Sequence, residues 1–213
     1  MSASHKVRIT KELLDAATGA SPWDVGNGVL YDLCRRYPAH RRVDEIVAKL
    51  WLIGRTYAAA IERRRVKTAF TGDAFYIDYV APKLIAWNID RSLSGLAGHS
   101  DIDDASLAGI LSAHRALTDA FCKLTRLDKR SLASKYLHFH YPHLFFIYDT
   151  RADAALRRLS VPHNGKAVAD GDADRVYRVF CLKCLALRDE VETAHGVRLT
   201  PRHLDNLLLA VAH

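Results

Sequence analysis

The chain has 213 residues, of which 49% are apolar and 26% charged, a balance typical of a globular protein rather than of a disordered one. Lys and Arg exceed Asp and Glu to give a formal net charge of +7, spread along the whole sequence. A basic surface favours a polyanionic partner, and a merely soluble surface is the alternative. No apolar stretch is long enough to span a membrane, and the N-terminus has no signal-peptide core. We therefore expect a cytoplasmic monomer without membrane contact.

Apolar residues recur three and four positions apart through most of the chain, which predicts helices. A serine N-cap followed by proline favours a helix that begins at Ser21, and a helix that contains Pro82 should kink or split there. Gly196 is a suitable C-cap. The helices that we expect after Ser21 lie at 43–64, 73–87, 104–124, 172–196 and 200–212.

No alternating run is long enough to require a sheet, so the predicted fold class is all-α. We expect one compact helical domain over residues 1–213, either undivided or split into sub-lobes 1–100 and 101–213 with a cleft between them. The helical periodicity is interrupted by the polar loop 161–172. This loop either only connects two helices or contacts a ligand.

The cysteines and histidines do not favour a metal site. Cys181 and Cys184 form a single CxxC, and Cys34 and Cys122 lie far upstream, so we expect reduced core thiols. The histidines of HFHYPH, 138–143, lie too close together to share one helix face, and no carboxylate accompanies them at helical spacing. We predict neither a metal nor a cofactor.

The stretch after Leu124 carries the most information. A helix closes near Leu124, the basic turn TRLDKR follows, and a second helix begins near Arg130. That helix must stop before Pro142, because the residue before a proline avoids helical geometry. The apolar run LFFIY, 144–148, should be buried and extended, and Asp149 follows at the N-cap position of TRADAALRRL. A helix cap alone would explain this aspartate, since its charge suits the helix dipole.

Lys129 precedes Asp149 by 20 positions, and the basic helix–turn–helix, the apolar run and the capping aspartate follow one another in a distinctive order. This order resembles the helix–hairpin–helix DNA glycosylases, and in particular the 8-oxoguanine glycosylase branch, over residues 105–160. Some compact members of that branch carry a second lysine on the helix after the turn, as Lys135 does here. The turn LTRLDKR contains no glycine, whereas the family's hairpin usually carries Gly-x-Gly.

The resemblance implies that Asp149 stabilises the cation-like sugar while a lysine, or water, attacks it. A nucleophilic lysine needs a pKa below its ordinary value of about 10.4, which desolvation or cationic neighbours provide. Lys129 has Arg126 and Arg130 nearby, and Lys135 lies on an apolar helix. We favour Lys129 because of its spacing from Asp149, with Lys135 as the alternative.

Further side chains are expected to bind DNA or to enclose a flipped-out base. Arg55 and Glu62 lie seven positions apart on one face of the predicted helix 43–64. They either line the base pocket or form a solvated ion pair. The candidate DNA contacts are Arg126, Arg130, His138, His140 and Arg151, and the candidate pocket residues are Trp23, Arg55, Tyr57 and Glu62.

We therefore expect a DNA glycosylase that removes a damaged or modified base, with or without abasic-site lyase activity, in repair or in defence against foreign modified DNA. One alternative is a non-catalytic basic helical protein that binds DNA and uses Asp149 only as a cap. The other is a nuclease or toxin that depends on the histidines of HFHYPH.

Overall fold

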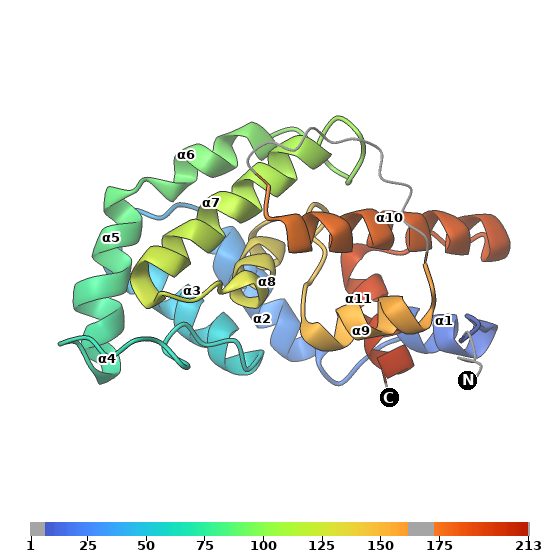
Figure 1. Ribbon diagram of the computed structural model, residues 1–213, viewed down its shortest axis with the longest axis horizontal. Helices are drawn as coiled ribbons and strands as arrows, with labels where there is room; N and C mark the ends of the chain where they lie inside the picture. The colour runs from blue at the N-terminus through green and yellow to red at the C-terminus, as the bar shows by residue number, and fades with distance from the viewer. Residues whose placement is uncertain (1–6, 162–172, 213) are drawn as a thin grey trace.

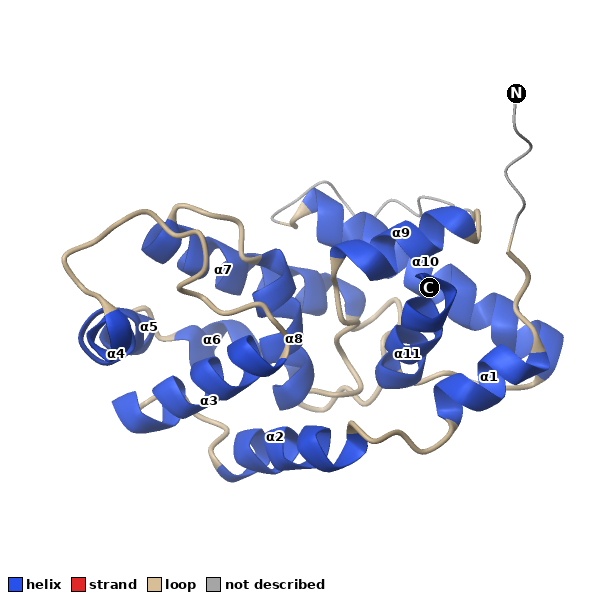
Figure 2. Cartoon of the chain, turned by 90° about the horizontal axis from the view of Figure 1, so that it is seen from below, coloured by secondary structure: helices blue, strands red, loops and turns tan. Residues whose placement is uncertain are grey.

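The computed structural model describes residues 7–161 and 173–212, and these form helices, turns and loops without any strand (Figure 2), so the all-α class is confirmed. The loop singled out at 161–172 lies outside the described residues except for Val161. No described helix is long and apolar enough to cross a membrane. The α-helices are α1 (Lys11–Thr18), α2 (Asp24–Arg36), α3 (Val43–Thr56), α4 (Gly72–Ala74), α5 (Ala81–Ala86), α6 (Ile89–Leu93), α7 (Leu107–Thr125), α8 (Arg130–His140), α9 (Thr150–Arg158), α10 (Arg175–His195) and α11 (Pro201–Ala212).

Helix α8 lies at the centre of the molecule, where α2, α3 and α7 pack against it (Figure 1). Residues 132–139 of this helix are all buried, whereas a surface helix buries only one stripe. Helix α11 packs against both α1 and α9. The division into sub-lobes 1–100 and 101–213 stays a prediction, although α8 packs against helices from both halves.

The segment 144–148 is buried, as predicted; Leu144 ends a turn, residues 145–148 have no regular secondary structure, and no strand of the described chain pairs with them. Side chains satisfy its backbone instead, through hydrogen bonds between Tyr148 N and Ser134 Oγ (3.0 Å), His138 Nδ1 and the Phe145 carbonyl (2.9 Å), and Tyr177 Oη and the Phe146 carbonyl (2.9 Å). A buried backbone group without a partner costs about as much as a lost hydrogen bond, so these contacts hold the segment in place.

Three helix ends follow the sequence signals. Helix α8 stops at His140, two residues before Pro142. Asp149 is the N-cap of α9, as predicted, and Gly196 ends α10 with a left-handed φ of 69°. Each of these ends depends on residues within one helical turn, which explains why the sequence predicts them.

The helix predicted over residues 43–64 is wrong in its second half. Helix α3 ends at Thr56, and the amide of Ala59 donates to the Gly54 carbonyl (2.8 Å) as the chain folds back. A Cβ on Gly54 would lie only 3.0 Å from the Cα of Ala60, so the absent side chain lets the returning chain pass this closely.

Two other boundaries differ in detail. Helix α2 begins at Asp24, because residues 21–23 form a turn in which the Trp23 amide donates to Ser21 Oγ (3.2 Å). In the stretch predicted at 73–87, a π-helix over Phe75–Val80 joins α4 to α5. Pro82 has no amide hydrogen, and the wider π turn before it accommodates the break.

Three fully enclosed histidines make folding sensitive to acid. Burial lowers the pKa of His40 to about 4, and the pKa values of His114 and His138 to about 3, from an ordinary value of 6.5. The unfolded chain therefore takes up these protons first as the pH falls below 6.5, which favours unfolding. Asp205 acts in the opposite direction between about pH 6 and 3.8, because burial raises its pKa.

We expect the free energy of unfolding to fall between pH 6.5 and pH 4, by up to about 1.4 kcal/mol per pH unit for each histidine. The measurement is the urea midpoint at pH 7, 6 and 5. His138→Gln cannot titrate, so its slope should be shallower than that of the original protein. A midpoint that does not change over this range contradicts the argument.

Candidate active site

Lys135 and Asp149 are brought together by the buried connection between α8 and α9. The Lys135 ammonium donates to the carbonyl of Tyr148 (3.2 Å), the residue directly before Asp149, and to Ser131 Oγ (2.8 Å) one turn earlier on α8. Lys135 Nζ lies 3.7 Å from Asp149 Oδ2. The buried segment 144–148 therefore returns the chain to α8 and places a carboxylate beside a buried amine.

The two carboxylate oxygens of Asp149 have different roles. Oδ1 accepts hydrogen bonds from the amides of Arg151 and Ala152, each at 2.9 Å, and so caps α9. Oδ2 faces Lys135. One side chain thus stabilises a helix and also presents a negative charge to the lysine.

Burial gives the amine of Lys135 unusual chemistry. Its side chain is 3% exposed. Desolvation lowers its pKa below the ordinary value, while the carboxylates of Asp149 and Asp205 oppose that shift and Arg151 and Arg202 add to it. A larger share of neutral amine is therefore present near pH 7 than in an exposed lysine, and only the neutral form is nucleophilic.

Lys135 and Asp149 line a cavity of about 540 Å³ formed by residues of α1, α2, α3, α8, α9 and α11. Tyr57 lies on its wall with its ring centroid 6.0 Å from Lys135 Nζ, and Trp23, which is 72% exposed, borders it. Arg151, at the exposed start of α9, also lines this cavity. The volume and the aromatic side chains suit a flat organic ring.

The same cavity contains a second charged pair that sequence reasoning missed. Arg202 Nη1 donates to Asp205 Oδ2 (3.1 Å) on α11. Burial raises the pKa of Asp205 to about 6, although Arg202 opposes the shift. The sequence shows Arg202 and Asp205 three positions apart on a predicted helix. Such pairs usually lie on the surface, and it is the tertiary structure that buries this one.

Lys129 lies in a different place. Its ammonium bonds to the backbone carbonyls of Ala60 and Arg63, in a hollow of about 390 Å³ that also contains Arg64. It does not line the cavity of Lys135 and Asp149. The spacing of 20 residues predicted that Lys129 would lie beside Asp149, but in the structure Lys135 does. The reason is that segment 144–148 returns to the second turn of α8 and not to its start.

Three of the residues expected to contact DNA are engaged inside the protein. His138 is fully buried, with Nε2 2.7 Å from Tyr31 Oη, and His140 is partly buried, with Nε2 3.3 Å from Lys49 Nζ. Arg130 donates from Nε to both oxygens of Asp174 at 2.8 Å. Contact of these groups with DNA would first require breaking these internal bonds, so their role stays a prediction that the geometry does not favour. Arg126 and Arg151 are exposed and remain available.

Of the four expected pocket residues, Trp23 and Tyr57 line the cavity and Arg55 and Glu62 do not. Glu62 lies beyond the end of α3, so the two do not share a helix face as expected. They are nevertheless paired, with Arg55 Nη2 3.3 Å from Glu62 Oε1, and the Arg55 guanidinium covers the Trp51 ring at 4.5 Å. The solvated ion pair is the reading that fits this geometry.

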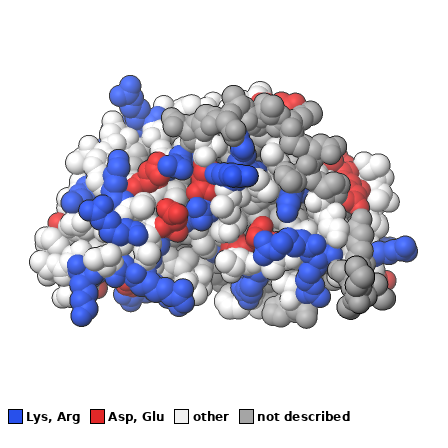
Figure 3. Space-filling view, viewed as in Figure 1, with Lys and Arg blue, Asp and Glu red and all other residues white. Residues whose placement is uncertain are grey.

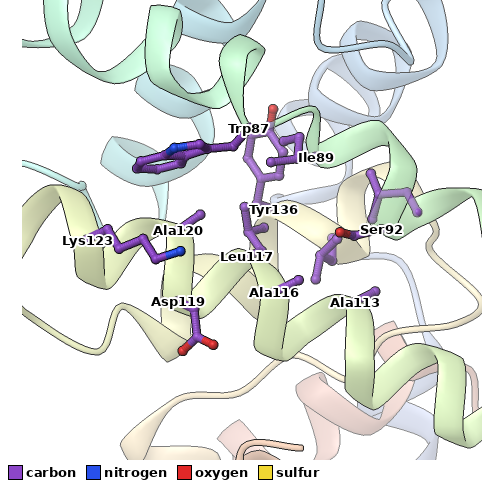
Figure 4. Close-up of a pocket in the computed structure, with 12 residues that line it drawn as sticks. Trp87, Ile89, Ser92, Ala113, Ala116, Leu117, Asp119, Ala120, Lys123 and Tyr136 are labelled. Atoms are coloured by element: carbon purple, nitrogen blue, oxygen red, sulfur yellow. The ribbon is translucent and has the colours of Figure 1, made fainter. Parts of the chain in front are cut away.

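A smaller cavity of about 240 Å³ borders α7 (Figure 4). Lys123 and Trp87 lie on one side of it, with Nζ 5.6 Å from the ring centroid. Asp119 pairs with Arg115 rather than with Lys123. This cavity brings no buried amine to a carboxylate, so we place the candidate active site at Lys135 and Asp149.

Exposed cations border the candidate site on one side. Lys and Arg side chains gather over the region of the loop between α3 and α4, at the lower left of Figure 3. Arg63, Arg64 and Lys67 of this loop are exposed, and we call them the basic loop. Ala58, which begins the same connection, lines both the active-site cavity and the hollow of Lys129. Arg63 and Arg64 line the hollow of Lys129, which thus shares one wall residue with the cavity.

No family model matches this sequence, and comparisons with curated proteins and with solved structures find no similar chain. Within the described residues, no three His, Cys, Asp or Glu side chains are grouped so that they could hold a metal ion. Cys34, Cys181 and Cys184 are buried free thiols and Cys122 is a partly buried one.

We expect Asp149→Ala to lower the free energy of unfolding by about 1–2 kcal/mol, because α9 loses its cap. Asp149→Asn retains an oxygen for the amides of Arg151 and Ala152, so its loss should be below about 1 kcal/mol. Urea unfolding at pH 7 measures both values. Equal destabilisation by the two variants would mean that the charge beside Lys135, rather than the cap, holds this region.

Proposed function

We propose that the protein is a DNA glycosylase-like enzyme that removes a damaged or modified base and then cleaves the abasic site. The observation that carries this proposal is a buried lysine beside a helix-capping carboxylate, both facing one cavity that is large enough for a base. An amine held out of water and a fixed negative charge are the two groups that this reaction needs.

The substrate is a nucleotide whose base has left the stack. Extrusion costs a few kcal/mol, which contacts in the pocket must repay. The Tyr57 ring supplies a face against which a base packs, and Trp23 supplies another at the cavity border. Aromatic stacking contributes about 1–3 kcal/mol for each base.

In the chemical step, neutral Lys135 Nζ attacks the anomeric carbon C1′ as the glycosidic bond breaks, and the electron pair of that bond leaves with the base. The base takes a proton from water, and the amine loses its own proton to solvent. The sugar ring then opens to a Schiff base, loss of a C2′ proton expels the 3′ phosphate, and water releases Lys135. Each step is a proton transfer or a displacement, so no oxidant is required.

Asp149 stabilises the positive charge that develops on the sugar. Its position is fixed before substrate arrives, because Oδ1 is held by two backbone amides. A charge that does not have to reorient stabilises a transition state more than solvent does. The partly positive N-terminus of α9 is itself offset by this carboxylate.

The DNA backbone is expected to cross the basic loop. Arg63, Arg64 and Lys67 carry exposed charges, and Arg63 and Arg64 line the hollow that shares Ala58 with the cavity. Arg151 lines the cavity itself at the start of α9. Phosphate contacts of this kind supply most of the affinity for DNA without reading sequence.

Borohydride reduction during reaction with an abasic-site duplex should trap a covalent adduct with the protein, and Lys135→Gln should abolish it. Lys129→Gln is the matched control, because its ammonium bonds to backbone carbonyls away from the cavity, and it should still form the adduct. Asp149→Asn should bind DNA but lose most of its excision activity. The readout is the cross-linked band on a denaturing gel.

Two results decide between this proposal and its rivals. Abasic sites that form without any trapped adduct indicate water as the nucleophile, with Asp149 acting on the water or the sugar cation. DNA binding without excision in every assay leaves a non-catalytic DNA-binding protein and refutes the enzyme.

DNA affinity should fall steeply as salt rises, because each phosphate contact releases a counterion. Replacing Arg63, Arg64 and Lys67 together by Gln should reduce the slope of log K against log salt by about 3, since each contact contributes about 0.9. The matched control replaces Arg8, Lys11 and Arg91, which are exposed residues of the N-terminal segment, α1 and α6. Equal slopes for the two triple variants would exclude the basic loop from the interface.

A further inference from the structure

Arg202 and Asp205, which line the active-site cavity, each keep one buried polar atom without a hydrogen-bond partner. The unpartnered atoms are Nη2 of Arg202, a donor, and Oδ1 of Asp205, an acceptor. Asp205 is 4% exposed, and both residues line the same cavity as Lys135. Buried polar atoms in folded proteins almost always have partners, so a donor and an acceptor left open together point to a ligand.

Other atoms of the two residues are held by contacts inside the protein. Arg202 Nη1 bonds to Asp205 Oδ2 (3.1 Å), and Arg202 Nε donates to Tyr31 Oη (3.3 Å). The guanidinium also covers the rings of Tyr57 and Phe139, each at 5.6 Å from the centroid. These contacts fix the plane of the guanidinium, so the open donor and the open acceptor keep a constant relation to each other.

We propose that Arg202 and Asp205 select a base whose edge carries a ring N–H beside a carbonyl, that is, a lactam edge. Asp205 Oδ1 accepts from the ring N–H, and Arg202 Nη2 donates to the carbonyl oxygen. This inference rests on the proposed function, since it names the class of base that the cavity takes.

The reaction itself favours a lactam over an edge that carries an amino group beside a ring nitrogen. When the bond from C1′ to the base breaks, the electron pair stays on the base and negative charge spreads through the conjugated ring. In a lactam that charge reaches the carbonyl oxygen, where the Arg202 guanidinium donates to it. A preorganised cation at the atom where charge develops stabilises the transition state more than the bound substrate.

The test uses duplexes that carry uracil, hypoxanthine or an 8-oxopurine, each compared with the analogue methylated on the lactam nitrogen. Methylation removes the N–H and leaves the carbonyl, so we expect at least one parent base to be excised about tenfold faster than its methylated partner. Single-turnover excision rates give the ratio for each pair. In Asp205→Asn the amide oxygen must face the donor Nη1 of Arg202, so the NH2 group takes the place of Oδ1 and this ratio should fall toward one.

Controls separate recognition from folding and from lysine chemistry. Arg115→Gln and Asp119→Asn change an ion pair of the same kind on α7, outside the cavity, and should leave the ratio unchanged. Adduct formation on an abasic duplex requires no base, so the two α7 variants should retain it, and any change of it in Asp205→Asn measures the effect of the Asp205 charge on Lys135 apart from base recognition. If Asp205→Asn does not fold, Arg202→Lys carries the test, because one ammonium cannot replace the fixed guanidinium fork.

The inference is overturned if parent and methylated bases are removed equally, if Asp205→Asn keeps the full ratio, or if only bases with an amino edge are excised. Absence of excision from all three pairs also overturns it. In that case trapping on the abasic duplex shows whether Lys135 still acts as a nucleophile, so that only the proposed base class, and not the proposed function, is refuted.

Discussion

The structure depends on one constraint, which is that the irregular segment 144–148 is buried with no strand of the described residues beside it. Its backbone groups need partners, and side chains of α8 bond to Phe145 and Tyr148 while Tyr177 of α10 bonds to Phe146. Ser134 and Lys135 both bond to Tyr148. Because this segment cannot shift without breaking these bonds, Asp149 is held beside Lys135 as a consequence of how the core is satisfied.

Lys135 therefore serves the fold and the proposed chemistry with the same atom. Its ammonium is a hydrogen-bond donor to Ser131 and Tyr148 when it is protonated, and a nucleophile when it is neutral. A buried charge is costly unless it is paired, and Asp149 at 3.7 Å pairs it loosely. A loose pair keeps the lysine in place while burial still favours the neutral amine, which is the balance that a Schiff-base enzyme requires.

The buried cations of the cavity are paired with carboxylates, whereas Arg151 at the exposed start of α9 and the basic loop are not buried. Lys135 and Arg202 face Asp149 and Asp205, so the interior carries two opposite pairs. The basic loop at the border carries exposed cations instead. This division suits a nucleic-acid substrate. Its phosphates remain in solvent, where long-range attraction guides association, while its base enters a region where individual hydrogen bonds determine which base is bound.

The sequence by itself determined the helical class, the cap at Asp149, the stop before Pro142 and the turn at Gly196, because those signals act within one helical turn. Only the tertiary structure decided which lysine meets Asp149 and that Arg202 and Asp205 join them. Helix α8 is enclosed by α2, α3 and α7, so its polar residues Lys135 and His138 are buried along with its apolar ones. Burial on every side is a property of the neighbours of a helix, and periodicity within the helix does not encode it.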